Sequence, residues 1–349
     1  MHAFTNGITL KKVLVIKLGT AAITLPSGLV NTKQLALICN QLASLHSRYH
    51  LLVVSSGAVG SGKAFIEKYK GTINQKKAAA AIGNPLLMAT YARLLGKHSI
   101  VTAQCLCERS HFSNRKSFVQ LKATITELWK SNIVPIANDN DVVNDRELRF
   151  SDNDELATLL AVAFNAKMLL IGSSVDGLLD AKGELLNQVS KIDESILALV
   201  RPEKSAGGLG GMFSKLTHTR LATSLGIDTV IFNARRPKGI EEAYQGLGGT
   251  HFIAQKSNLN ARQKWLLSGS THGALVVDAG AAAALRKRKS LLAVGILRIK
   301  TPFVKGEMID IEDEEGQVLA MAKSRITAQE AATKQPSLIV AHANDIQLS

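Results

Sequence analysis

Cysteine is scarce in this chain of 349 residues, which contains only Cys39, Cys105 and Cys107. This number is odd, and the spacing matches neither a zinc site nor a disulfide framework. Cys105 and Cys107 lie in an apolar, strand-like run, so we expect them to be buried thiols. Sparse cysteines without disulfide spacing predict a protein of the reducing cytoplasm.

Long hydrophobic runs are also missing from the sequence. No apolar stretch approaches the roughly 20 residues that a membrane-spanning helix needs. The first ten residues lack a charged segment followed by a long apolar core, so we expect no signal peptide. With 46% hydrophobic and 20% charged residues, the composition is typical of a packed globular protein. Its length predicts about two domains.

Basic residues outnumber acidic ones, which gives a net charge of +14. The excess lies in the first part, because residues 273–349 contain ten Lys/Arg and nine Asp/Glu. In that first part few aromatic residues lie among the lysines to stack on bases. A solvated basic surface that attracts anionic nucleotides is therefore favoured over a nucleic-acid site. The basic run Arg286–Lys289 is interpreted as a solvated helix end, with a nucleic-acid contact as the alternative.

The first 255 residues alternate strand-like and helix-like segments. Helices are expected at 32–48 and 75–95, the second broken at Gly83-Asn84-Pro85, and strands at 13–16, 51–54, 100–105, 133–137, 168–172 and 229–232. Because the strands read as unbroken apolar runs, we expect them to be buried on both faces. The pattern predicts an α/β fold, a three-layer sandwich with a mainly parallel sheet.

After Gln255 the pattern changes. Residues 256–272 are interpreted as a linker. From Gly273 the segments are short, strand-like and separated by turns, with strands expected at 274–277, 294–299, 308–311 and 318–322. The sequence therefore predicts two domains, residues 1–255 and a small β-barrel formed by residues 273–349.

Two polar clusters point to a ligand pocket. Asn138-Asp139-Asn140-Asp141 follows an apolar run and so lies at a strand end, and Ser151-Asp152-Asn153-Asp154 precedes a helix as its cap. Amides and carboxylates at such ends can hold a small zwitterion, where open α/β sheets bind their ligands. Polar turns are the plainer interpretation of either cluster alone. The two together, with the glycines and lysines below, favour the pocket.

The segment Gly57–Ala64 nearly matches the Walker A motif. Ala64 stands where a Ser or Thr hydroxyl would bind magnesium. No apolar strand ends in a lone Asp suited to the Walker B role. A P-loop NTPase is therefore disfavoured, and we expect Ser56-Gly57 to open a helix whose backbone N–H groups hold a phosphate or carboxylate.

A second glycine-rich segment, residues 207–211, precedes Lys215 in the first turn of a helix that runs to about Leu225. The glycines allow close backbone approach and the lysine supplies charge, which favours phosphate binding over a mobile connector. Lys17 ends the first strand, with Gly19 two residues on. Its ammonium group can therefore reach over the carboxyl edge of the sheet.

Together these motifs resemble the amino acid kinase family, in the form that carries a C-terminal PUA domain. The resemblance rests on residues 15–20, 54–58, 138–141, 151–154, 175–178 and 208–215. It implies the amino acid kinase fold with a PUA-like barrel. It also implies ATP-dependent phosphorylation of the side-chain carboxylate of L-glutamate to L-glutamyl 5-phosphate, the first step of proline biosynthesis. The alternatives are a family member acting on acetylglutamate or uridylate, and an RNA-binding protein acting through the PUA-like domain.

The resemblance also implies roles for individual residues. Catalysis would fall to Lys17, Lys215 and Asp154, and glutamate binding to Ser56, Gly57, Asn138, Asp141 and Asn153. ATP would be held by Lys17, Gly19, Ser173, Ser174, Leu209, Gly210, Gly211, Met212, Phe213, Ser214 and Lys215, with Mg²⁺ as the metal. A homo-oligomer and feedback inhibition by proline are further implications. Ala21, Ser174 and Phe213 depart from the family pattern, all on the nucleotide side.

The implied chemistry suits these residue types. A glutamate carboxylate has a pKa of about 4.3, so it is already an anionic nucleophile at neutral pH and needs no catalytic base. The obstacle is repulsion between this anion and the terminal phosphate. Two fixed ammonium groups would offset that repulsion.

Overall fold

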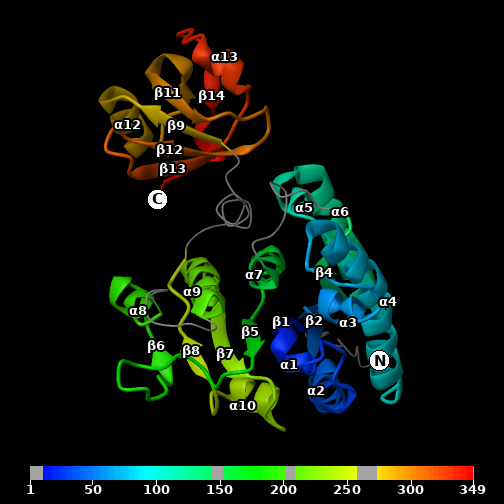
Figure 1. Ribbon diagram of the computed structural model, residues 1–349. Helices are drawn as coiled ribbons and strands as arrows, with labels where there is room; N and C mark the ends of the chain where they lie inside the picture. The colour runs from blue at the N-terminus through cyan, green and yellow to red at the C-terminus, as the bar shows by residue number, and fades with distance from the viewer. Residues whose placement is uncertain (1–10, 144–151, 201–208, 258–272, 349) are drawn as a thin grey trace, which may run out of the picture. The chain divides into compact units, whose positions relative to one another are not determined.

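The structure is a computed structural model that describes residues 11–143, 152–200, 209–257 and 273–348. The described residues of 1–109 and 122–257 form one compact unit, and those of 110–121 and 258–349 form a second (Figure 1). The predicted linker lies almost wholly outside the described residues, as do Ser151, Gly207 and Gly208.

The first unit is built on an eight-stranded sheet with the order β3-β4-β2-β1-β5-β7-β8-β6. Its strands are β1 (Lys12–Leu18), β2 (Tyr49–Ser55), β3 (Thr102–Cys107), β4 (Val134–Asp139), β5 (Met168–Ser173), β6 (Gln188–Val189), β7 (Asp228–Asn233) and β8 (Thr250–Phe252). Neighbours run parallel except β7 and β8. The mainly parallel sheet is therefore confirmed. β6 and β8 were not predicted, because two or three residues carry no readable periodicity.

Helices cover both faces of this sheet. They are α1 (Thr20–Ile23), α2 (Thr32–His46), α3 (Ala58–Lys63), α4 (Ile73–Gly96), α6 (Arg115–Lys130, shared between the units), α7 (Asn153–Ala163), α8 (Glu194–Ala198), α9 (Leu209–Ser224) and α10 (Gly239–Gln245). α2, α4 and α10 lie on one face, and α7 and α9 on the other (Figure 1). On the central strand Leu14, Val15 and Ile16 are each 0% exposed, so both faces are buried as predicted.

α4 runs unbroken through Gly83, Asn84 and Pro85, so the predicted break is wrong. These residues instead serve close packing between α3 and α4. A Cβ atom at Gly83 would lie 1.8 Å from the backbone oxygen of Ala58, and one at Gly62 would lie 1.9 Å from that of Ala79. Glycine is therefore required at this helix crossing. Gly62, within the near-match to Walker A, has a packing role.

The second unit is rich in strands. A five-stranded sheet has the order β11-β9-β12-β13-β15, and a two-stranded sheet joins β10 to β14. The elements are α5 (Ser110–Ser113), β9 (Gly273–Val277), α12 (Ala279–Arg286), β10 (Leu291–Leu292), η2 (Ala293–Gly295), β11 (Ile296–Thr301), β12 (Met308–Glu312), β13 (Val318–Lys323), α13 (Ala328–Ala332), β14 (Ile339–Ala341), η3 (Ala343–Asp345) and β15 (Ile346–Leu348). The strand expected from 294 begins only at Ile296, because a 3₁₀ turn precedes it. Arg286–Lys289 are exposed at the end of α12, as the helix-end interpretation requires.

Cys107 is buried as predicted, whereas Cys105 is partly exposed; Cys39 is buried as well, and all three are free thiols. Burial raises the pKa of Cys39 to about 12 and that of Cys105 to about 11, so both stay protonated at neutral pH. Within the described part of the chain, no helix is both long and apolar enough to cross a membrane.

Candidate active site

The carboxyl ends of four strands meet at one edge of the sheet. Leu18 of β1 pairs with Ser55 of β2 and with Gly172 of β5. β4 lies beside β2 and ends at Asp139. Lys17, Ser56, Asn138 and Ser173 are therefore brought to one edge, on either side of the central strand. Ligands of doubly wound sheets bind at this position.

Asp154 lies at the centre of this edge, between two lysines. Its Oδ1 atom is 2.5 Å from Lys17 Nζ, and its Oδ2 atom is 2.9 Å from Lys215 Nζ. The side chains of Asp154, Lys17 and Lys215 are 1%, 5% and 12% exposed. Three groups predicted from separate motifs thus form one buried ionic cluster with an excess positive charge.

The cluster shifts the pKa values of its members. Burial lowers the pKa of Lys17, and Lys215 lowers it further, against the attraction of Asp154. Burial acting alone would raise the pKa of Asp154, but the two ammonium groups outweigh it and hold that pKa below its ordinary value. Asp154 therefore remains an anion at neutral pH and holds the two cations together.

The start of α7 positions Asp154. Asp152 is the N-cap, and its Oδ1 atom accepts hydrogen bonds from the backbone N–H groups of Asp154 at 2.8 Å and Glu155 at 3.1 Å. This confirms the predicted cap. The hydroxyl of Ser214 on α9 donates to Asp152 Oδ2. One capping residue therefore ties the start of α7 to the segment that carries Lys215.

A cavity of about 490 Å³, which we call the amino-acid cavity, lies beside the cluster. All five residues predicted to bind glutamate line it: Ser56, Gly57, Asn138, Asp141 and Asn153. Gly57 is the N-cap of α3 and has a left-handed conformation, with φ of 104°, which glycine adopts without strain. The remaining lining residues are Thr20, Ala58, Val59, Gly60, Lys63, Tyr69, Asp139 and Asp152.

Hydrogen bonds join the amides of this cavity. Asn153 Nδ2 donates to Ser56 Oγ at 3.0 Å and to Asn138 Oδ1 at 2.9 Å. Asn153 Oδ1 is buried and has no hydrogen-bond partner among the described residues. A buried acceptor without a partner costs about 1–3 kcal/mol, so it is a suitable point for a ligand donor.

A smaller cavity of about 250 Å³, the phosphoryl cavity, contains the lysines. Its lining residues are Lys17, Gly19, Thr20, Ala21, Ala22, Ser56, Asp152, Asn153, Asp154, Ser173, Ser174 and Lys215. Thr20, Ser56, Asp152 and Asn153 line both cavities, so the two adjoin. The guanidinium group of Arg235 donates to the backbone oxygen of Ala21 at 2.6 and 3.1 Å, which holds this wall in place.

The second glycine-rich segment differs from its prediction. α9 begins at Leu209, so residues 209–214 are helical and Lys215 lies in the second turn. Residues 211–214 are not among the described residues that line either cavity, and Phe213 is 41% exposed. Of the predicted ATP residues, Lys17, Gly19, Ser173, Ser174 and Lys215 line the phosphoryl cavity.

Several site residues, among them Thr20, Lys63, Asn84 and Asp152, were not assigned a role from the sequence. Thr20 and Asp152 line both cavities, and Asn84 on α4 accepts a hydrogen bond from Asn138. Asp152 belongs to the second polar cluster, which was predicted to cap a helix and to lie at a ligand pocket, but no role of its own was assigned to it. Asn84 is a polar residue within an alanine-rich helix, and this is the sequence feature from which its role could have been suspected.

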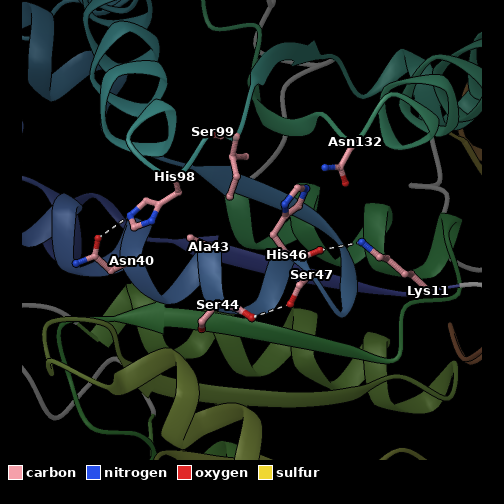
Figure 2. Close-up of a pocket in the computed structure, with 10 residues that line it drawn as sticks. Lys11, Asn40, Ala43, Ser44, His46, Ser47, His98, Ser99 and Asn132 are labelled. Carbon is pink, nitrogen blue, oxygen red and sulfur yellow. Dashed lines mark hydrogen bonds between the residues drawn. The ribbon is translucent and has the colours of Figure 1, made fainter.

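A third cavity, of about 600 Å³, lies at the opposite ends of β1 to β4 (Figure 2). It contains none of the predicted site residues. Lys11 Nζ donates to the backbone oxygen of His46 at 3.1 Å, and His98 Nε2 bonds to Asn40 Oδ1 at 2.9 Å. The polar groups of this cavity therefore form hydrogen bonds with the end of α2 and with one another. Among the described residues, no group of three or more His, Cys, Asp or Glu side chains could hold a metal ion.

Comparison with known proteins defines the class of protein. The model of the amino acid kinase family matches residues 12–233, and that of the PUA domain matches residues 273–341. The chain therefore belongs to the amino acid kinase family, and it is a kinase that uses ATP.

Within that family the chain is similar to curated glutamate 5-kinases. It is 33% identical to Glutamate 5-kinase of Pasteurella multocida over 325 residues, covering 90% of this chain and 89% of the relative. It is 36% identical to Glutamate 5-kinase of Gloeobacter violaceus over 332 residues, covering 91% and 90%. A solved structure of carbamate kinase from Giardia lamblia bound to AMP-PNP matches with a TM-score of 0.53 at 18% identity, covering 70% of this chain and 99% of that one. That likeness shows the fold.

Proposed function

We propose that this kinase transfers the terminal phosphoryl group of ATP to the side-chain carboxylate of L-glutamate, which gives L-glutamyl 5-phosphate and ADP. This is the first step of proline biosynthesis. The observation that carries the proposal is the pair of ammonium groups held on Asp154, because Lys17 and Lys215 line a cavity that adjoins an amide- and carboxylate-lined pocket. The names of the curated relatives support the same substrate.

The reaction needs charge compensation more than proton transfer. A carboxylate oxygen of glutamate forms a bond to the terminal phosphorus, and the bond from that phosphorus to the bridging oxygen breaks, so that the electron pair leaves with ADP. Both reactants are anions. Lys17 and Lys215 would stabilise the negative charge on the transferred group, and Asp154 keeps them at fixed positions.

The amino end of glutamate would occupy the amino-acid cavity. Asp141 lines that cavity and is a suitable partner for the α-ammonium group, as is the unpaired acceptor of Asn153. Lys63 is the one Lys or Arg among the described lining residues, and we assign it the α-carboxylate. Ser56, Gly57 and Asn138 would complete the contacts. The side-chain carboxylate then points towards the adjoining phosphoryl cavity.

ATP would place its phosphates in the phosphoryl cavity, against Lys17, Gly19, Ser173, Ser174 and Lys215, with residues 209–214 contributing at the start of α9. We propose Mg²⁺ as the metal. This ion is usually bound through substrate phosphates with one or two carboxylates, and Asp152 is the carboxylate of the phosphoryl cavity that is not paired with a lysine. When bound, it would neutralise charge on the phosphates.

The remaining assignments rest on the resemblance. We propose residues 1–255 as the kinase domain, 256–272 as a linker and 273–349 as the PUA domain. We also propose a cytoplasmic homo-oligomer that proline inhibits, since proline is a zwitterion of the kind that the amino-acid cavity suits. RNA binding by the PUA domain is the second function, with the exposed run Arg286–Lys289 in its support.

A substrate panel tests the proposal. The chain is incubated with ATP, Mg²⁺ and either L-glutamate, N-acetyl-L-glutamate, uridine monophosphate or carbamate, and acyl phosphate is trapped as its hydroxamate while ADP is measured. We expect glutamate alone to give both hydroxamate and ADP. Turnover of another acceptor without turnover of glutamate would refute the assignment.

A further inference from the structure

Asn84 is a buried amide in the middle of α4, 5% exposed, and it lines neither cavity of the active site. Its Oδ1 atom accepts a hydrogen bond from Asn138 Nδ2 at 2.9 Å. Asn138 is itself buried at the end of β4 and lines the amino-acid cavity. Asn84 therefore does not line the amino-acid cavity itself, but it forms a hydrogen bond with Asn138, which does.

One backbone group fixes the orientation of these amides. The backbone N–H of Asp139 donates to the side-chain oxygen of Asn138 at 3.0 Å, and an N–H group can only donate. The oxygen of Asn138 is thereby identified, and its Nδ2 must face Asn84. Asn84 in turn must present its oxygen, because two amino groups cannot bond to each other.

The orientation of the Asn138 amide also determines the orientation of the Asn153 amide. The oxygen of Asn138 accepts from Asn153 Nδ2 at 2.9 Å, and the same Nδ2 donates to Ser56 Oγ at 3.0 Å. With both donor hydrogens of Asn153 used, its Oδ1 is left as a buried acceptor without a partner among the described residues. If Asn138 were reversed, its Nδ2 would face Asn153 Nδ2, and this arrangement would be lost.

We propose that Asn84 is a positioning residue for the amino-acid substrate. Its oxygen fixes the orientation of the Asn138 amide, and Asn138 fixes the orientation of the Asn153 amide. In this orientation Asn153 Oδ1 is available to accept a hydrogen bond from the α-ammonium group. This inference rests on the proposed function. Asn84 itself touches no substrate. Substitution of Asn84 should therefore weaken binding of the α-ammonium group of glutamate and leave ATP binding unchanged.

The test compares Asn84→Leu, which removes the acceptor at similar size, with Asn84→Asp, which keeps an acceptor oxygen for Asn138. KM and kcat are measured for L-glutamate and for glutarate, which lacks the α-ammonium group. Loss of a hydrogen bond to a charged group predicts a rise of about tenfold or more in KM for glutamate in Asn84→Leu, with little change for glutarate or ATP. Asn84→Asp should stay within about threefold of the wild type, since the bond that orients Asn138 remains.

Gln41→Leu is the matched control, because Gln41 is also 5% exposed and accepts a backbone N–H, from Ile240 at 2.9 Å, on α2. It should lower the melting temperature without changing KM for glutamate. If Asn84→Leu does not fold, Asn84→Ala is used in the same comparison.

A double-mutant cycle separates positioning from general damage. Once Asn153→Ala removes the oriented amide, adding Asn84→Leu should cause no further rise in KM for glutamate, whereas independent effects would multiply. The proposal is overturned if the effects multiply, if glutarate is affected as strongly as glutamate, or if KM for glutamate does not change. Wild-type enzyme that fails to phosphorylate glutamate would instead refute the proposed function.

Discussion

Lys17 Nζ lies 2.5 Å from Asp154 Oδ1, and both side chains are almost fully buried. Replacing Asp154 with Asn would leave two buried ammonium groups close together without an anion. Breaking a buried ion pair from one side costs about 3–5 kcal/mol. We therefore expect Asp154→Asn to lower the free energy of unfolding by an amount of that order and to reduce kcat by about 10²-fold or more.

Asp180→Asn is the control for this substitution, because Asp180 caps a surface turn of the same unit through backbone N–H groups. Denaturant unfolding and steady-state kinetics are the measurements. Unchanged kcat in a folded Asp154→Asn variant would contradict the role of this cluster.

Lys215 is the second cation on Asp154, at 2.9 Å from Oδ2. Its ammonium group is expected to act on charge that develops during phosphoryl transfer. Lys215→Ala should therefore lower kcat by about 10²–10³-fold, while KM for glutamate changes little. Lys130→Ala, at an exposed pair with Glu127, should leave both constants unchanged. A large rise in KM for glutamate with normal kcat would place Lys215 in substrate binding instead.

The low pKa of Lys17 predicts a pH dependence. Burial first and Lys215 next lower this pKa, against the pull of Asp154. Because Lys17 is needed as a cation, activity should fall as pH rises through its folded-state pKa, below the ordinary lysine value of about 10.4. The pH profile of kcat measures this. In Lys17→Arg the side chain does not lose its proton, so the remaining activity should not show this alkaline fall. A fall only above the ordinary lysine value would refute the assignment.

Lys63 lines the amino-acid cavity and has no ion-pair partner among the described residues. If it binds the α-carboxylate, Lys63→Met should raise KM for L-glutamate by about tenfold, which corresponds to about 1.4 kcal/mol. The 1-amide of L-glutamate has no charge at that position, and the variant and wild type should bind it alike. Lys76→Met, at an exposed position on α4, is the matched control. Equal losses for the acid and the amide would contradict this contact.

The crossing of α3 and α4 predicts a contrast between two glycines of one helix. A Cβ atom at Gly83 would meet Ala58 O at 1.8 Å, whereas one at Gly96 would meet nothing within 4 Å. We expect Gly83→Ala to cost about 3 kcal/mol of stability. Gly96→Ala should be neutral or stabilising by up to about 1 kcal/mol, because alanine favours the helix. Thermal unfolding of both variants is the test, and equal stability would contradict the packing.

Local patterns were sufficient to predict the sheet and much of the site. Buried parallel strands read as unbroken apolar runs, and the polar residues at their carboxyl ends collect at one edge, which predicts Lys17 and Asn138 there. Asp154 was expected from the helix-cap pattern, and its role came from the family resemblance; the structure brings all three residues to that edge. Contacts between elements distant in sequence could not be predicted. No periodicity shows that Ser214 bonds to Asp152, or that Asn84 supports Asn138 across 54 positions.

The error at Gly83–Pro85 has a physical cause. Glycine and proline normally interrupt a helix, and the break predicted in α4 followed from that tendency. Tertiary packing reversed it, because the absent Cβ atom at Gly83 is what lets α3 approach. Likewise, the glycines before Lys215 indicated a loop, but the helix begins at Leu209.

The common wall of the two cavities has a consequence for inhibitor design. Thr20, Ser56, Asp152 and Asn153 line both spaces, so ligands in the two cavities would lie next to each other. A bisubstrate compound would carry a glutamate carboxyl group joined covalently to a nucleotide phosphate. It would gain binding free energy from both cavities but lose translational and rotational entropy only once, whereas two separate ligands lose it twice.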